Sequence, residues 1–197
     1  MHYVAYPVVD ALPNEAQSIE IATFRPEFIL GDVALAVHPS DKRYRNLVGR
    51  FALNPLTNVE IPIIGDTDVN PNEGNGVFQV CPNHCPRAYK LAQNHQVSEE
   101  KSSVEKTDVK SIALDVQVMD FDGNIWFSDK QDEAYVKSKI KIEGMDRLLA
   151  REEILNELER IGLYRGYADA EQEVKICRHT GNLIEEIFSA QWYFRLS

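Results

Sequence analysis

Proline, glycine and asparagine divide residues 1–81 into short apolar runs, and this punctuation restricts the fold more than any other feature of the chain. In residues 18–24, the β-branched side chains of Ile19, Ile21 and Thr23 occupy alternate positions, as in a strand with one buried face. Short, closely spaced strands of this kind favour a curved sheet or a barrel. The predicted strands lie at residues 3–9, 18–24, 34–37, 51–53, 59–64 and 77–81.

Helical patterns follow this strand-rich part. Pro86 can open a helix through residue 94, because its fixed φ and missing N–H are tolerated in a first helical turn. The strongest pattern begins at Asp146, a suitable N-cap, and runs to residue 161, where Gly162 ends it. The apolar residues near one face of this helix are Leu148, Leu155, Leu158 and Ile161.

A hairpin and two closing strands complete the predicted elements. Apolar side chains alternate over residues 111–119, and the Asp122-Gly123 turn signal precedes an aromatic pair. Residues 164–167 and 173–176 have the composition of further strands. The pattern predicts an α+β fold dominated by β-structure.

The size and composition predict one globular domain over residues 1–197. The chain is 44% hydrophobic and 26% charged, which is ordinary for a protein that can bury a core. Residues 97–110 contain few large apolar side chains, so we expect them to form a mobile insertion.

The charge and cysteine content limit the partners and the compartment. No run approaches the roughly 18 apolar residues of a membrane span, and the N-terminus lacks an export signal. Three cysteines do not make an even disulfide framework, which predicts a cytoplasmic protein. A net charge of −10 argues against a surface-wide DNA footprint. Local basic patches at residues 42–45 and at Arg87 with Lys90 stay open, with solvated loops as the alternative.

Two segments carry the chemistry. Residues 22–32 read ATFRPEFILGD, and residues 74–89 read GNGVFQVCPNHCPRAY. Gly74 and Gly76 permit a close turn before the strand at residues 77–81. Together the segments resemble the editing domain inserted into the class I tRNA synthetases for valine, isoleucine and leucine.

The tail favours the valine enzyme. Residues 177–185, CRHTGNLIE, and residues 191–193, QWY, are similar to the stretch where valyl-tRNA synthetases leave their editing domain. Residues 144–151 match the helix entry of the same enzymes. The resemblance runs over residues 3–194 and implies a β-barrel-like editing domain with peripheral helices. It also implies a parent enzyme that uses ATP and magnesium on other domains, with no cofactor for this one.

The resemblance implies a hydrolytic activity. A synthetic site separates valine from threonine by only about a hundredfold, a limit for which the valine enzyme is itself the standard example. The acceptor end of mischarged tRNA therefore enters the editing domain, where water releases threonine from the ester. The chemistry requires a carboxylate for the α-ammonium, donors for the terminal adenosine, and polar groups that fix the hydroxyl and the water.

Several of these working residues are replaced. In the first segment Thr23, Arg25 and Glu27 match the family, whereas Phe24 and Phe28 stand in place of threonines. In the second, the family's lysine, threonine and two aspartates are replaced by Gln79, Cys81, Cys85 and Ala88. The residues that the resemblance assigns to substrate binding are Thr23, Arg25, Glu27, Phe28, Gly76, Gln79, Cys81, Cys85 and Ala88.

The replacements predict weak or absent hydrolysis of threonyl-tRNA. An alanine at position 88 cannot hold an ammonium group, and losing such a charge-assisted contact costs several kcal/mol. No residue is assigned a catalytic role. The prediction fails if another acid, for instance Glu27 or Asp32, occupies the vacated place.

Three other interpretations use the same residues. A non-catalytic module could guide the acceptor end of tRNA through Arg25, Arg87 and Lys90, or brace the other domains of the synthetase. Cys81, His84 and Cys85 carry thiol and imidazole groups of the kind that bind zinc. Cys177 and His179 would complete such a zinc site. A cysteine hydrolase would use Cys81 or Cys85 as nucleophile and His84 or His179 as base. If His84 is structural instead, as its counterpart in the family is, we expect it to make a local backbone hydrogen bond.

Overall fold

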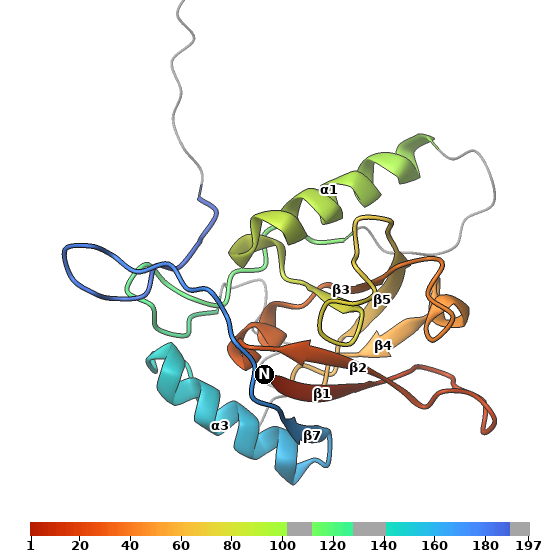
Figure 1. Ribbon diagram of the computed structural model, residues 1–197, viewed down its shortest axis with the longest axis horizontal. Helices are drawn as coiled ribbons and strands as arrows, with labels where there is room; N and C mark the ends of the chain where they lie inside the picture. The colour runs from red at the N-terminus through yellow and green to blue at the C-terminus, as the bar shows by residue number, and fades with distance from the viewer. Residues whose placement is uncertain (102–111, 128–140, 190–197) are drawn as a thin grey trace, which may run out of the picture.

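A computed structural model describes residues 1–101, 112–127 and 141–189, which contain two β-sheets and two α-helices (Figure 1). The first sheet has the order β2-β1-β7 and the second the order β4-β5-β3-β6. The strands are β1 (His2–Pro7), β2 (Ser18–Thr23), β3 (Ala34–Val37), β4 (Phe51–Leu53), β5 (Glu60–Gly65), β6 (Val77–Val80) and β7 (Tyr164–Tyr167). The predicted α+β class is confirmed, and within the described ranges neither sheet closes into a barrel.

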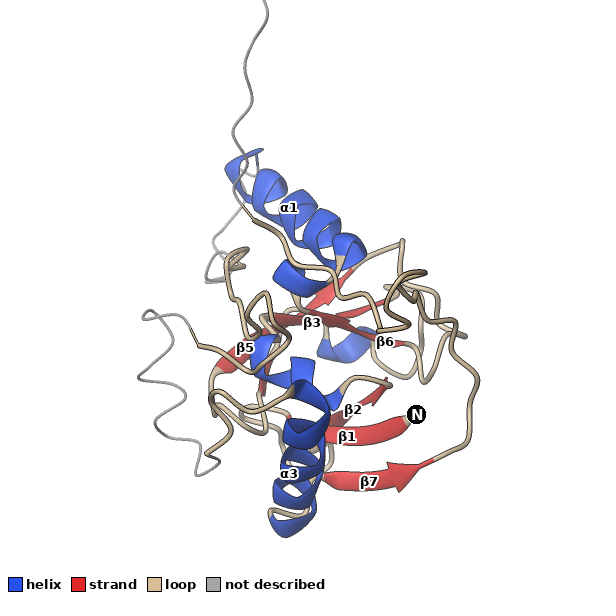
Figure 2. Cartoon of the chain, turned by 90° about the vertical axis from the view of Figure 1, so that its left-hand side faces the viewer, coloured by secondary structure: helices blue, strands red, loops and turns tan. Residues whose placement is uncertain are grey.

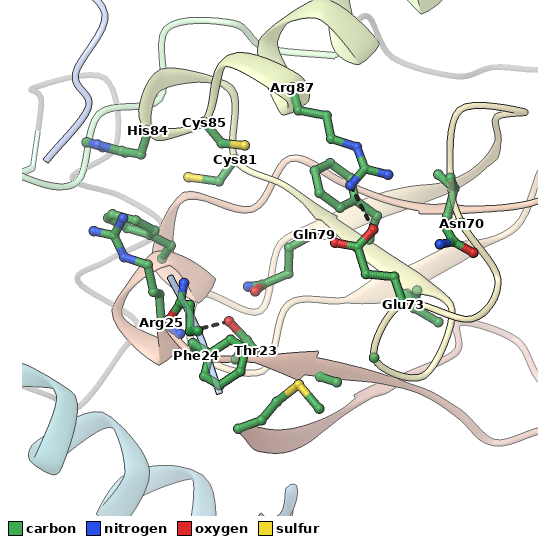
Figure 3. Close-up of a pocket in the computed structure, with 18 of the residues that line it drawn as sticks. Thr23, Phe24, Arg25, Asn70, Glu73, Gln79, Cys81, His84, Cys85 and Arg87 are labelled. Carbon is green, nitrogen blue, oxygen red and sulfur yellow. Dashed lines mark hydrogen bonds and ion pairs between the residues drawn. The ribbon is translucent and has the colours of Figure 1, made fainter. Parts of the chain in front are cut away.

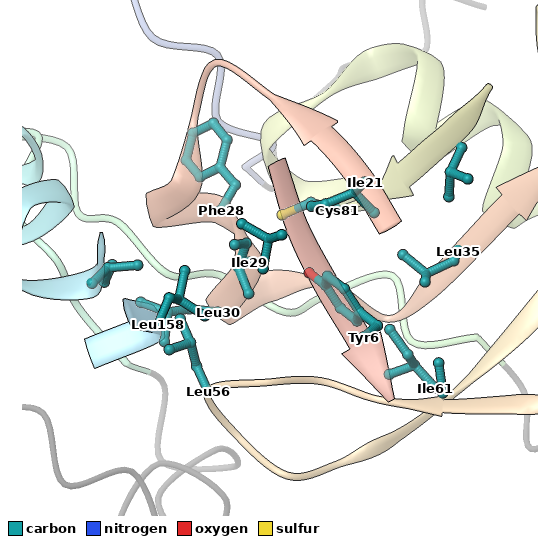
Figure 4. Packing of buried hydrophobic residues seen from close by; sticks show 14 of the residues in the cluster. Tyr6, Ile21, Phe28, Ile29, Leu30, Leu35, Leu56, Ile61, Cys81 and Leu158 are labelled. Atoms are coloured by element: carbon teal, nitrogen blue, oxygen red, sulfur yellow. The ribbon is translucent and has the colours of Figure 1, made fainter. Parts of the chain in front are cut away.

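The two sheets share one hydrophobic core. An antiparallel bridge between Val8 and Ala52 joins the end of β1 to β4 of the other sheet. Strand β3 lies between β5, which is parallel to it, and β6, which is antiparallel. Figure 4 shows side chains from both sheets and from helix α3 packed together. Fully buried members of this cluster include Tyr6, Ile21, Ile29, Leu35, Ile63 and Leu158.

The opposite face of the second sheet is covered by α1 (Pro86–Lys101). Because successive strand residues point to opposite faces, Leu35 and Val37 of β3 face the main core while Ala34 and Ala36 contact the cluster under α1. Figures 1 and 2 place α1 and α3 on opposite sides of the sheets. The helix extends beyond the predicted residue 94 into the predicted insertion, whose residues 102–110 lie outside the described residues.

Helix α3 (Arg147–Arg160) begins and ends as predicted, but its buried face differs in part. The Asp146 carboxylate accepts the Leu148 N–H at 2.8 Å, and Gly162 follows the helix with φ +72°. Leu158 is buried as expected, whereas Leu148 is 45% exposed because it lies in the first turn, beyond the core. The residues that α3 buries are Ala150, Ile154 and Leu158.

Two predicted β-elements are not regular strands. The predicted strand at residues 173–176 forms one isolated bridge, between Ile176 and Leu183, because no strand of the described ranges pairs with it. The predicted hairpin reduces to a bridge between Met119 and Ile125, with its turn held by the Asp120 carboxylate. Residue 111 lies outside the described residues. None of the helices described here is both long enough and apolar enough to cross a membrane.

An ion pair fixes α3 to the 3₁₀ helix η1 (Pro26–Gly31). The Glu27 carboxylate is fully buried, and Arg151 of α3 donates to it at 2.9 Å from Nε and 2.8 Å from Nη2. Arg25 is a second, more distant partner, with its Nε 3.4 Å from Glu27 Oε1. A buried carboxylate is tolerable only with such partners.

Replacing Arg151 by Met should therefore destabilise the protein by about 3 kcal/mol, because it leaves the Glu27 carboxylate buried with one long contact. The control is Arg160→Met on the same helix, which breaks only an exposed pair with Glu157 and should cost about 0.5 kcal/mol or less. Denaturant unfolding measures both. Equal losses would show that the Glu27 pair does not hold the helix.

Candidate functional site

The two sequence segments converge on one cavity of about 390 Å³ (Figure 3). The end of β2 and the residues after it supply one side, and β6 with the turn into α1 supplies the other. The amide of Asn75 donates to the carbonyl of Glu20, which fastens the loop before β6 onto β2. The segments contribute Ala22, Thr23, Phe24, Arg25 and Phe28 from the first, and Gly74, Gly76, Val77, Phe78, Gln79, Cys81, His84, Cys85 and Arg87 from the second.

Gly76 is required by the close turn that the sequence predicts. Its φ is +86°, a conformation that favours glycine. A Cβ at this position would lie 2.8 Å from the carbonyl oxygen of Pro71. The bare backbone therefore lets the loop fold tightly against the cavity wall.

Arg25 lies at the wall with its charge already paired. Its guanidinium is 3.8 Å from the centre of the Phe28 ring, a cation–π contact that the replacement of threonine by phenylalanine provides. Besides Glu27, it contacts the carboxylate of Glu185 in the tail. Glu185 also accepts Arg147 Nε at 2.8 Å. This chain of ion pairs holds the tail against the cavity.

His84 is a structural residue. Its Nε2 accepts the backbone N–H of Val118 at 3.0 Å, and its ring stacks on Phe28 with centroids 4.8 Å apart. Burial, followed by the nearby positive charge of Arg25, lowers the pKa of His84 to about 4. The imidazole is therefore neutral at pH 7 with its accepting nitrogen in use. The expected hydrogen bond to the backbone is present, but its partner lies 34 residues away, so the expectation that it is local is wrong.

The structure gives no support to the zinc interpretation or to Cys81 as a nucleophile. Burial raises the pKa of the Cys81 thiol well above its ordinary value, so the nucleophilic and metal-binding thiolate is disfavoured. His84 cannot act as its base while Nε2 accepts from Val118. The described part of the chain holds no group of three or more His, Cys, Asp or Glu side chains placed for a metal ion, so zinc has no support. Cys177 and His179 do not line the cavity.

Gln79 is the polar side chain that β6 directs to the cavity floor. Its Nε2 donates to Asp32 Oδ2 at 2.9 Å, and the same oxygen accepts the Tyr6 hydroxyl at 2.5 Å. Asp32 is only 6% exposed. Burial raises the pKa of Asp32 to about 7, although the hydrogen bonds from Tyr6 and Gln79 oppose this shift. We call Tyr6, Asp32 and Gln79 the carboxylate relay.

Glu27 and Ala88 do not line the cavity. Glu27 is buried in its ion pairs, and Ala88 is fully buried in the apolar cluster under α1. The seven other predicted binding residues do line it: Thr23, Arg25, Phe28, Gly76, Gln79, Cys81 and Cys85.

Two acids of the wall were not foreseen, and both are paired with cations. Glu73 accepts Arg87 Nη1 at 2.9 Å, and Glu186 pairs with Lys175. Glu73 directly precedes the glycine turn, which is the one signal that could have placed it at the wall. Glu186 reaches the site only through the path of the tail. Tyr6, also missed, reaches the site through the pairing of β1 with β2.

No family model matches this chain. Valine–tRNA ligase from Bacillus subtilis is 31% identical over 195 residues, which are 99% of this chain and 19% of that protein. The Thermotoga maritima enzyme is 34% identical over 193 residues, 98% of this chain and 19% of that protein. The mitochondrial enzyme of Rattus norvegicus is 33% identical over 192 residues, 98% of this chain and 15% of that protein.

The chain is homologous to one segment of the valine–tRNA ligases. The match to these ligases covers nearly the whole chain, so the resemblance carried by the two short segments and the tail is confirmed. The chain spans about a fifth of the length of the bacterial relatives, 19% in both cases. Because bacterial and mitochondrial ligases match it similarly, the cytoplasmic location stays a prediction.

Asp32 should make the protein less stable as pH rises. The pKa of Asp32 is about 7 when folded against an ordinary 3.8, so between these values the folded state holds more protons than the unfolded chain. The free energy of unfolding then falls with pH by up to about 1.4 kcal/mol per unit. Asp32→Asn removes this contribution. The stability of the Asp32→Asn protein, relative to that of the unmodified protein, should rise between pH 4 and pH 7 and then level off.

The difference between the two proteins is the quantity to measure, by urea unfolding at a series of pH values. His84 has the opposite effect, because its pKa falls from 6.5 to about 4 on folding and its contribution grows as pH rises through that window. The two slopes oppose each other in the unmodified protein, whereas subtraction isolates Asp32. A difference that is constant with pH would contradict the burial of an ionisable Asp32.

Proposed function

We propose that this chain is the editing domain of a valine–tRNA ligase and that its cavity receives the aminoacylated 3′ adenosine of a mischarged tRNA. The observation that carries the proposal is the convergence of both family segments on one cavity. Its volume of about 390 Å³ lies within the range of small-molecule pockets. The tRNA acceptor end and the remaining domains of the ligase are the partners this role implies.

The wall is better suited to binding than to fast hydrolysis. Cleavage of the ester requires a group that takes a proton from the attacking water and donors for the developing oxyanion. His84 is neutral with its acceptor nitrogen in use, and Cys81 is a protonated thiol. The carboxylates of Glu73 and Glu186 are paired with cations. We therefore expect hydrolysis of threonyl-tRNA to be weak or absent.

Cys85 is the position from which to restore a carboxylate. It is half-buried and lines the cavity, and it replaces one of the two aspartates of the family segment. Ala88, at the other aspartate position, is enclosed by apolar side chains. A carboxylate at 85 would face the bound ester, whereas one at 88 would enter the core beneath α1.

Cys85→Asp should accordingly raise the rate of threonyl-tRNA deacylation by about tenfold or more, which is less than a well-positioned carboxylate contributes. The assay follows release of labelled threonine from mischarged tRNA for valine. Rapid turnover by the unmodified protein would contradict the weakened site. Salt-dependent binding of tRNA, with no turnover by either protein, would favour a non-catalytic guide for the acceptor end.

Ala88→Asp should instead destabilise the protein by about 3 kcal/mol or more without increasing the rate, because the charge is buried without a partner. Gln93→Asp on the exposed side of α1 is the control, with an expected change within about 0.5 kcal/mol. Thermal or urea unfolding measures both variants. A stable Ala88→Asp protein with increased activity would show that position 88 faces the substrate.

A further inference from the structure

We propose that the side-chain carbonyl of Gln79 recognises the cationic α-amine of the bound aminoacyl group and that Asp32 is its positioning residue. This inference rests on the proposed function, because it assigns a part of the substrate to a part of the same cavity. In this wall Gln79 replaces the family's lysine, and the core residue Ala88 replaces one of the family's aspartates. The assignment to Gln79 therefore gives the amine a binding group there.

Asp32 fixes the orientation of the Gln79 amide. Above its pKa of about 7 Asp32 is ionised, and an ionised carboxylate can only accept hydrogen bonds. Asp32 Oδ2 accepts Gln79 Nε2 at 2.9 Å and the Tyr6 hydroxyl at 2.5 Å. The NH₂ group of Gln79 therefore faces the buried acid. The carbonyl oxygen Oε1, at the other end of the planar amide group, is directed away from Asp32.

The Oε1 atom of Gln79 is open to the cavity. Gln79 is half-buried and lines the cavity. Figure 3 shows its side chain projecting from β6 into the space between Arg25 and Arg87. Oε1 is not enclosed, and within the described ranges it has no hydrogen-bond partner. An open acceptor in a partly dry cavity selects a ligand with an N–H donor.

When it is ionised, above a pKa of about 7, Asp32 places a negative charge directly behind the amide, which polarises Gln79 and favours a cation in front of Oε1. The other acids of the wall are less available, since Glu73 is bound to Arg87 and Glu186 to Lys175. A lysine at position 79 would pair with Asp32 and present no acceptor to the ligand.

The experiment compares two non-hydrolysable probes by isothermal titration calorimetry just above pH 7, where most of Asp32 is ionised. The cationic probe is 3′-(L-threonylamino)-3′-deoxyadenosine, and the neutral probe carries a methyl group of similar size in place of the ammonium. The unmodified protein should bind the cationic probe about tenfold or more tightly than the neutral one, as expected for a hydrogen bond to a charged group. Gln79→Leu should reduce the ratio to about twofold or less, with affinity for the neutral probe unchanged.

Two further variants separate recognition from folding. Gln79→Lys should reverse the preference, which a merely structural role for position 79 would not do. Asp32→Asn should lower the ratio without abolishing binding of the neutral probe, because an asparagine can donate to Gln79 and release its amide to turn. Glu73→Gln removes the other acid beside β6 and, as the matched control, should leave the ratio unchanged.

A ratio that survives in Gln79→Leu, or one that is lost in Glu73→Gln, would overturn the assignment. Equal binding of both probes to the unmodified protein would also overturn it, while leaving the proposed adenosine-binding cavity intact. Binding of neither probe would overturn the proposed function and the assignment with it.

Discussion

The buried carboxylate of Asp32 is the interaction on which the site depends. A charge in the interior is costly unless its acceptors are satisfied. Here Oδ2 takes hydrogen bonds from Tyr6 of β1 and Gln79 of β6, whereas the buried Oδ1 has no partner among the described residues. These strands belong to different sheets, and Asp32 follows η1. The carboxylate relay therefore joins both sheets and the first sequence segment at the cavity floor. The position of Gln79 follows from this junction.

A second network fixes the opposite side of the cavity. Glu27 and Glu185 both pair with Arg25. Glu27 also pairs with Arg151 of α3, and Glu185, in the tail, pairs with Arg147 of α3. These ion pairs attach α3 and the tail to the wall at Arg25. The cations and acids that reach the wall are thus largely paired. The cavity is left with an apolar and thiol-rich lining around a neutral amide, which suits recognition better than activation of water.

Most strands could be predicted because alternation and turn residues are local signals. β3 and β4 begin and end where the sequence predicts, since apolar runs bounded by turn residues define them. The strand at residues 173–176 failed because a strand also needs a neighbour, which no local pattern reveals. Convergence of the two segments followed from the family resemblance and not from periodicity. The burial of Ala88 depends on the phase of α1 against the sheet, and the contact between Tyr6 and Asp32 depends on tertiary packing.

The most direct measurement is a carbon-13 NMR titration of the Asp32 side-chain carboxyl in the folded protein, assigned by comparison with Asp32→Asn. The relay predicts a pKa of about 7 for Asp32, since burial outweighs the two hydrogen bonds that favour ionisation. A midpoint near the ordinary value of 3.8 would mean that the carboxylate is solvated, and would contradict its burial beside Tyr6 and Gln79.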